Sequence, residues 1–134
     1  MRLGKEEVAV RQLDTAIRLL FDGGDVVSVH TLACAAANVL RELLKAQGGE
    51  AWQNAIIESH PGMEREIYAT LVRAQNFFKH ADRDPQAELD FDENSNDETI
   101  IVATLEYGDL LRLVELPPSH RTGGGLVRPD ELAR

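Results

Sequence analysis

The feature that most constrains the fold is a long apolar stripe in which residues recur at intervals of three and four. The members of this stripe are Val29, Leu32, Ala33, Ala36, Leu40 and Leu43. Residues at this spacing share one side of an α-helix, so the pattern predicts a long helix that Asp25 caps and that runs to about Gln47. Gly48 and Gly49 follow and end it.

A second amphipathic pattern precedes this helix, over residues 5–21, with acidic residues in its first turn. Its apolar positions are Ala9, Leu13, Ala16, Ile17 and Leu20. The pattern ends at Asp22-Gly23-Gly24, so very few residues separate the two helices. They must therefore pack as an antiparallel hairpin, and the small residues of segment 33–37 let another backbone approach closely.

Two or three further helices follow the hairpin. We expect a short helix over residues 50–58 and a long one from Pro61 to about Arg83. The core face of the long one is expected to contain Ile67, Leu71, Ala74, Phe78 and Ala81. Residues 98–115 are rich in β-branched side chains and leave helix and strand open, although their length and the Ile101, Leu105 spacing favour a last helix to about Val114.

Length and composition predict one soluble domain. The 134 residues, 43% of them hydrophobic, suffice for a single modest core, which we expect to be an all-α bundle of four to five helices over residues 1–116. Residues 117–134 are rich in proline, glycine and charge and are expected to form a flexible tail. No run reaches the about 18 apolar residues of a membrane span, so a cytoplasmic protein without membrane contact is expected. The single cysteine, Cys34, excludes an internal disulfide.

The segment RAQNFFKH, residues 73–80, contains the best candidate site. Successive helical residues turn by about 100°, so Arg73 and His80 differ by about 20° in direction and lie roughly 10 Å apart along the axis. Asn76 lies between them on the same face, and together the three side chains suit a phosphate group. Phe77 adjoins them at about 40°, where a lone monomer has little reason to expose an aromatic ring, so this face also suggests a partner surface.

The hairpin AIRLLFDGGDVVSVHTLACAAANVLRELL, followed by a long helix ending in RAQNFFKH, resembles the HEPN superfamily of small helical-bundle proteins. The family hallmark is an arginine, four to six residues, and then a histidine, and the resemblance covers about residues 10–115. The phrase NFFKHADRDP also resembles an uncharacterised bacterial group of this shape. The resemblance implies a dimeric, metal-independent endoribonuclease of toxin or defence type, with Arg73 and His80 as motif residues. Other members of the superfamily bind nucleotides or have lost activity.

The chemistry of RNA cleavage fits these residues only in a dimer. Without a metal, cleavage needs a base, an acid and a cation that stabilises charge on the phosphate. Arg73 supplies the cation and His80 one proton carrier, so a twofold dimer joined through Arg73, Asn76 and Phe77 would supply the second. Active members usually carry a polar residue directly after the arginine. This chain has Ala74 there, so Asn76 would have to orient the phosphate or the imidazole.

Non-catalytic interpretations stay open for the same face. Lys79, His80 and Arg83 place positive charge at a predicted helix C-terminus, where the helix dipole favours it. The face would then join two subunits, bind a nucleotide or dock another protein, such as an antitoxin-like partner. The net charge of −9 argues against broad electrostatic attraction to nucleic acid. The sequence predicts no cofactor.

Metal sites are expected to be absent. His30 and Cys34 lie one turn apart, a spacing that a metal can use, but no third ligand is evident, and the sequence shows no base beside Cys34. His80, Asp82 and Asp84 are a further trio of ligand types, set where the helix ends. The acidic connector starting at Asp90 resembles a calcium loop, yet it has Ser95 and Ile101 where such a loop needs glycine and glutamate. A solvated loop that caps the next helix is the preferred interpretation.

Overall fold

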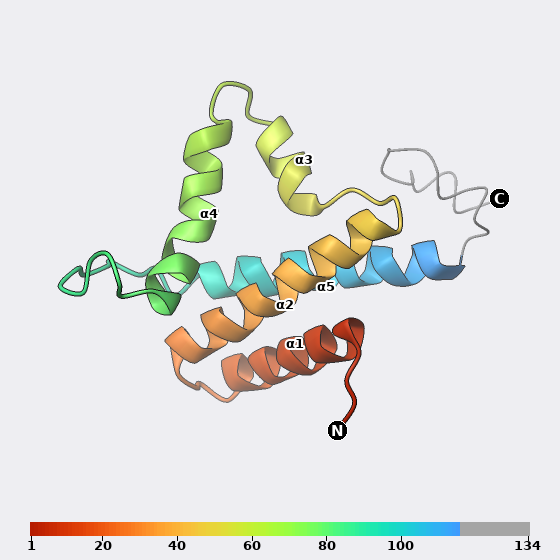
Figure 1. Cartoon of the computed structure of the whole chain (residues 1–134), viewed down its shortest axis with the longest axis horizontal. Helices are drawn as coiled ribbons and strands as arrows, with labels where there is room; N and C mark the ends of the chain where they lie inside the picture. The colour runs from red at the N-terminus through yellow and green to blue at the C-terminus, as the bar shows by residue number, and fades with distance from the viewer. Residues whose placement is uncertain (116–134) are drawn as a thin grey trace.

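The computed structural model describes residues 1–115 and is entirely helical over that range (Figure 1). Its elements, in chain order, are α1 (Lys5–Phe21), α2 (Val26–Ala46), α3 (Trp52–Glu58), α4 (Glu64–Lys79) and α5 (Ser95–Glu115). The predicted all-α class is confirmed, and residues 98–115 are helical, as part of α5. The predicted flexible tail, residues 117–134, lies outside the described residues.

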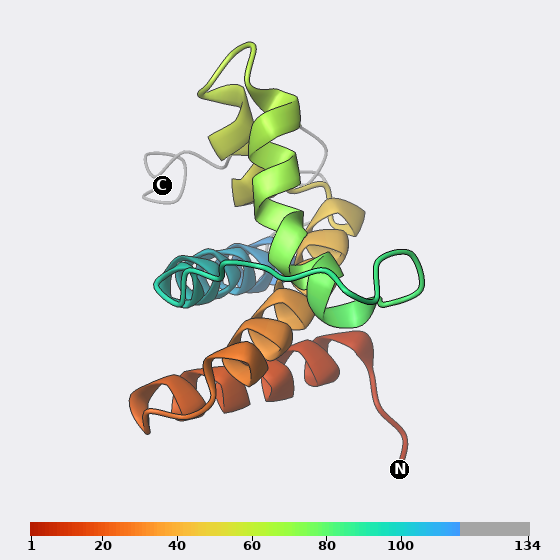
Figure 2. The same cartoon turned by 90° about the vertical axis from the view of Figure 1, so that its left-hand side faces the viewer.

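Helices α1, α2 and α5 form the core of the fold. In Figures 1 and 2, α2 lies between the other two, with α1 along one side and α5 crossing the opposite side. Most of the buried apolar side chains belong to one cluster shared by these helices, namely Ala9, Leu13, Ala16, Val29, Ala33, Ala36, Ala37, Leu40, Leu44, Ile100, Ala103, Leu110 and Leu113. Six of them are alanines, which allow the close helix contacts expected of the hairpin.

Local sequence signals set both ends of α2. The carboxylate of Asp25 accepts a hydrogen bond from the Ser28 backbone N–H at 2.8 Å, which satisfies one free donor of the first turn. At the other end, Gly48 has a positive φ of 81°, a conformation that glycine adopts without steric cost. Gly49 packs so tightly that an added Cβ would lie 2.6 Å from side-chain atoms of Leu44 and Leu113.

Helices α3 and α4 form a hairpin, which we call the arm, that projects away from the core (Figures 1 and 2). It buries little of its own surface: α3 has no buried residue, and Gln75 is the only buried residue of α4. One hydrogen bond across the two parts joins the Trp52 indole Nε1 to the Asp109 carboxylate of α5, at 2.8 Å. The arm is therefore attached mainly near its base.

The long helix predicted from Pro61 to about Arg83 is shorter in the structure, and both of its predicted limits are wrong. The structure starts α4 at Glu64 instead of Pro61, because Gly62 has a positive φ of 84° and forms the turn of the arm. It ends α4 at Lys79, since the backbone of His80 is extended, with φ −130° and ψ 133°. The predicted core face is only partly correct. Leu71 is 43% exposed and Ala81 lies beyond the helix, exposed.

Candidate functional site

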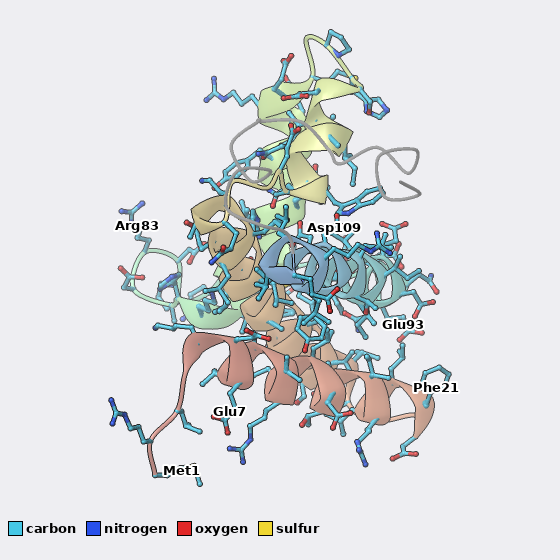
Figure 3. The ribbon with its side chains drawn as sticks, turned by 90° about the vertical axis from the view of Figure 1, so that its right-hand side faces the viewer. Met1, Glu7, Phe21, Arg83, Glu93 and Asp109 are labelled. Carbon is cyan, nitrogen blue, oxygen red and sulfur yellow. The ribbon has the colours of Figure 1, made fainter. Side chains whose placement is uncertain are left out.

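The predicted catalytic residues lie around the C-terminal end of α4. Arg73 and Asn76 are exposed on the last two turns, and His80 is exposed one residue beyond them, where its backbone N–H donates to the Asn76 carbonyl at 3.2 Å. The helical register that aligns Arg73 with His80 thus stops at Lys79. Arg83, expected in the last helical turn, instead projects outward from the following loop (Figure 3).

Phe77, predicted at a dimer interface, is only half-exposed. Its ring lies 6.1 Å from the ring of Phe78, in an edge-to-face arrangement. Phe78 in turn contacts His30 and Phe91, with ring centroids 5.6 and 5.2 Å away. Residues of the same chain thus cover part of the Phe77 side chain. Its exposed part lies next to Arg73 and Asn76 on the surface of α4.

A cavity of about 350 Å³ lies between the core and the base of the arm. Helices α2, α3, α4 and α5 line it, together with the segment 89–92, and apolar atoms form most of its exposed surface. Arg73 is part of this wall, whereas Asn76 and His80 are not. Arg73 and Asn76 therefore share the exposed face of α4, while the cavity wall also joins Arg73 to residues far away in the chain.

Glu106 is the most unusual residue of the cavity wall. Its side chain is 1% exposed, and neither carboxylate oxygen accepts a hydrogen bond from the described residues. Burial raises the pKa of this carboxyl, against the opposing effects of the Arg41 charge and the nearby backbone N–H groups of Gln53 and Trp52. These N–H groups lie at the start of α3, so the Glu106 carboxylate is placed at the N-terminal end of that helix, where partial positive charge favours its ionised form.

Arg41 contributes a second unsatisfied polar atom to the same cavity. Its terminal NH2 group donates to the side-chain oxygen of Asn38 at 2.7 Å, while its buried Nε finds no acceptor among residues 1–115. Arg41 and Glu106 are close enough to affect each other electrostatically but form no ion pair in the described chain. Arg41 and Glu106 thus both contribute to the cavity wall, while Arg41 Nε and the two Glu106 oxygens are themselves buried behind its surface.

A hydrogen-bonded chain of buried side chains lies beside this cavity. The Asn96 amide nitrogen donates to the Val26 carbonyl at 3.0 Å, which leaves its Oδ1 to accept from His30 Nδ1 at 2.9 Å. His30 Nε2 is then an acceptor, and the Cys34 thiol, 3.3 Å away, donates to it. Asn96, His30 and Cys34 thus all form hydrogen bonds while each side chain is neutral.

The pKa directions agree with this neutral arrangement. Burial lowers the pKa of His30, although the hydrogen bond to Asn96 opposes the shift. Burial also raises the pKa of Cys34 to about 11, despite the positive charges of Lys79 and Arg41. A thiol with such a pKa is a poor nucleophile near neutral pH, so the Cys34–His30–Asn96 chain serves packing between α2 and α5.

The other sequence candidates have structural roles or stay isolated. Within residues 1–115, no group of three or more His, Cys, Asp or Glu side chains is arranged to hold a metal ion. In the acidic connector, the Asp92 carboxylate accepts from the Asn94 backbone at 3.0 Å, just before α5 begins at Ser95. This bond stabilises the turn directly before α5, and capping of that helix by the connector stays a prediction.

Sequence reasoning missed Glu106, Arg41 and Asn96. The available signal for Glu106 was its spacing: it lies three residues after Ala103 and four before Leu110, on the buried side of α5. An acidic residue at such a position needs an explanation. No local signal could have shown that Asn96 bonds to a histidine 66 residues earlier.

One helix in the described part of the chain, α2, is long and apolar enough to cross a membrane, judged by length and composition alone. It is also the central helix of the core cluster, which accounts for its apolar character. Comparisons with protein-family models, with curated proteins and with solved structures found no match. The resemblance to the HEPN superfamily therefore stays a prediction from the residues quoted above.

Proposed function

We propose that this chain is a non-catalytic interaction module that acts as a homodimer, with two copies joined through the outer face of α5. The observation that carries this proposal is a stripe of exposed apolar side chains on that helix. The stripe consists of Ile101, which is 58% exposed, and Leu105, which is 42% exposed. Leu111, also 42% exposed, lies about 80° around the helix from Ile101. In Figure 2 none of the other helices of residues 1–115 covers the side of α5 that faces away from α2. Large apolar side chains exposed one turn apart on a surface helix are typical of a protein interface.

Gly108 adds a hollow to this stripe. It lies in the middle of α5, on the same side as Ile101 and Leu105, and a Cβ added there would meet nothing within 4 Å. Glycine in a helix interior costs about 1 kcal/mol relative to alanine, so its presence here has no benefit for the isolated chain. A neighbouring helix that approaches closely would use the space above it.

The stripe matches itself when two copies of α5 run antiparallel. Pairing that sets Ile101 opposite Gly108 of the partner subunit brings the large side chain into the hollow, and twofold symmetry repeats the contact. The same register sets Asp97, in the first turn of α5, opposite Arg112 of the partner subunit, in its last turn. Apolar contacts at the centre and opposite charges at both ends favour a second copy as the occupant.

Light scattering on matched variants tests the interface. Leu105→Arg should convert a dimer into a monomer, because it places a charge at the centre of the apolar stripe. Leu71→Arg is the control, since Leu71 is equally exposed, at 43%, but lies on the arm. Phe77→Arg tests the interface expected from the sequence. A monomeric wild-type protein, or dissociation by Phe77→Arg with no effect of Leu105→Arg, would contradict the proposal.

Metal-independent RNA cleavage is the second candidate function. The observation that favours it is the exposure of Arg73 and Asn76 on one face, with His80 exposed directly after the helix. Arg73 forms no ion pair within residues 1–115, so its guanidinium is available to a phosphate. A nuclease of toxin type would also predict an antitoxin-like protein partner.

Incubation of the purified protein with a mixed RNA pool, in the presence of a chelator, decides between the two functions. Cleavage by the wild type and none by His80→Ala would establish a ribonuclease centred on His80. His60→Ala is a matched control, because His60 is an exposed histidine at the turn of the arm. Intact RNA with all three proteins is the result expected of the interaction module.

A further inference from the structure

The C-terminal end of α4 meets α2 beside loop 80–94, which leads on to α5 (Figure 2). His30 of α2 is buried at this junction, with its ring centroid 5.6 Å from that of Phe78 in α4 and 4.9 Å from that of Phe91 in the loop. The two phenylalanine rings also contact each other, with centroids 5.2 Å apart. The hydrogen bond from His30 Nδ1 to Asn96 Oδ1, at 2.9 Å, adds α5 to the junction. His30 therefore connects the base of the arm, the loop and the core.

The side chains that cover His30 are held with unequal strength. Asn96 is completely buried and belongs to α5, which shares the apolar core cluster with α2. Phe78 and Phe91 are only partly buried, and Gln75 is the only buried residue of α4. The cavity between core and arm also reaches His30. Displacement of the two phenylalanine rings therefore brings water to His30 at a smaller loss of buried surface than separation of α2 from α5.

The hydrogen bonds of His30 require a neutral ring. Its Nδ1 donates to Asn96, while its Nε2 accepts from the Cys34 thiol at 3.3 Å. A proton on Nε2 removes this acceptor and leaves an N–H group facing sulfur, which is a weak acceptor. Burial lowers the pKa of His30, which agrees with a preference for the neutral ring. Protonation thus favours any state in which water surrounds the ring.

No carboxylate within residues 1–115 forms an ion pair with His30. The titratable and charged side chains that line the adjoining cavity or act at this junction are Cys34 and Arg41 from α2, Arg73 and Lys79 from α4, Asp90 and Asp92 from loop 80–94, and Glu98 and Glu106 from α5. Lys79 and Arg41 act on Cys34 with positive charge, the same sign as an imidazolium. Glu106 has the opposite effect, since burial raises the pKa of its carboxyl and its protonation favours the closed arm.

We propose that His30 is an acid-sensitive latch of the arm: protonation of its ring displaces Phe78 and Phe91 and frees the C-terminal end of α4 from a core that stays folded. The closed arm is fully favoured above the ordinary histidine pKa of 6.5 and is lost as the pH falls through the lower folded-state pKa. Release exposes the rings of Phe78 and Phe91 next to Phe77, so acid creates an aromatic surface that the closed form covers. The latch does not depend on either function proposed above.

The accessibility of Cys34 measures the opening. It is the single cysteine of the chain and is buried beside His30. Its reaction with dithiodipyridine, a disulfide reagent that modifies thiols in acid, is timed over a series of pH values. Each rate is divided by that of the urea-unfolded protein at the same pH, which removes the pH dependence of the thiol itself. The resulting protection should fall about tenfold for each pH unit below the folded-state pKa of His30, because opening takes up one proton.

Far-ultraviolet circular dichroism is recorded at the same pH values and should keep its native signal while the protection falls. Protection that stays constant until the helical signal is lost would overturn the proposal. A fall in protection that coincides with the loss of the helical signal would also overturn it, because both changes would then report global unfolding.

Variants assign the opening to His30 and its cover. His30→Gln retains a hydrogen-bonding group near Asn96 and removes the titrating ring, so protection should no longer depend on pH. Phe78→Ala should lower protection at neutral pH at least about tenfold, whereas Phe77→Ala, which removes the neighbouring ring, is the matched control and should change it less than about twofold. Glu106→Gln should retain the acid opening. Unchanged pH dependence in His30→Gln, or equal effects of the two phenylalanine substitutions, would contradict the latch.

Hydrogen exchange followed by mass spectrometry locates the released segment in the wild-type full chain. After correction for the intrinsic effect of pH, exchange in peptides from α4 and loop 80–94 should be at least about tenfold faster at about one pH unit below the folded-state pKa of His30. Peptides from α1 and α2 should keep their protection. Equal acceleration in peptides from α1, α2 and α4 would show unfolding of the whole domain and would refute a local release.

Discussion

The core and the arm of this molecule are both built from amphipathic helices, but they bury their apolar faces to very different degrees. In the core, Leu40 and Leu44 of α2 are completely buried. In the arm, Tyr68 and Leu71 of α4 are 54% and 43% exposed, although their spacing is equally regular. The comparison shows that helical periodicity predicts which residues share a side, and not whether another element covers that side.

The largest expected effect tests this contrast directly. Leu40→Ala should lower the free energy of unfolding by about 2–5 kcal/mol, because it leaves a cavity in a fully packed cluster. Leu71→Ala, the same substitution on the arm, should cost less than about 1 kcal/mol. Urea denaturation followed by circular dichroism measures both values. Similar losses in the two variants would mean that the arm is covered in solution.

A smaller effect is expected from the buried polar chain of the core. Asn96→Ala removes the partner of His30 and of the Val26 carbonyl, and should destabilise the protein by about 1–3 kcal/mol. Asn76→Ala, on the exposed side of the arm, should cost less than about 0.5 kcal/mol. Urea denaturation compares the two variants. An unchanged free energy of unfolding in Asn96→Ala would show that the Cys34–His30–Asn96 hydrogen bonds are dispensable for stability.

The pH dependence of the free energy of unfolding should also reflect the burial of His30 in the core. The pKa of His30 in the folded core is below its ordinary value of 6.5, chiefly because the side chain is buried. Its contribution to stability is therefore complete above that ordinary value and is lost as the pH falls through the lower folded-state pKa. His30→Gln should flatten this acid loss. Urea denaturation over a series of pH values measures the profile, and an unchanged acid loss in His30→Gln would contradict this origin.

The smallest effect is a gain of stability on the outside of the core. Gly108→Ala meets no neighbour, so it should stabilise the isolated chain by up to about 1 kcal/mol. In the proposed dimer the same methyl group occupies the hollow needed by Ile101 of the partner subunit. Introducing Gly108→Ala into Leu105→Arg, which is expected to be monomeric, isolates the gain in stability of the single chain from the clash in the dimer. The same gain in the free energy of unfolding with and without Leu105→Arg would contradict a close contact at Gly108.

The sequence predicted the parts of the fold that depend on local signals. The first two helices end close to their predicted limits, because Asp25 supplies a cap and glycines follow each helix. The long helix of the arm was predicted to continue to Arg83, since apolar periodicity extends past Lys79 and Pro85 restricts only the residue before it. The structure instead turns the chain at His80, where no local sequence signal stops a helix.

The cavity and its polar groups were not predictable in this way. Arg41 lies on α2 and Glu106 on α5, and their relation depends on how α5 crosses α2. A single sequence contains no direct record of that crossing. The sequence did indicate that Arg73 and Asn76 share a face, because the helical period alone fixes the directions of side chains within one helix. The sequence could therefore place residues within each helix, whereas sites shared between helices required the tertiary structure.

The hydrogen bond between Trp52 and Asp109 has a spectroscopic consequence. Trp52 is the single tryptophan of the chain, and its indole joins the first turn of the arm to α5 beside the cavity (Figure 3 labels Asp109). Indole emission depends on the polarity around the ring and on its hydrogen bond. The wavelength of intrinsic fluorescence is thus a built-in reporter of the distance between arm and core, and it needs no attached dye.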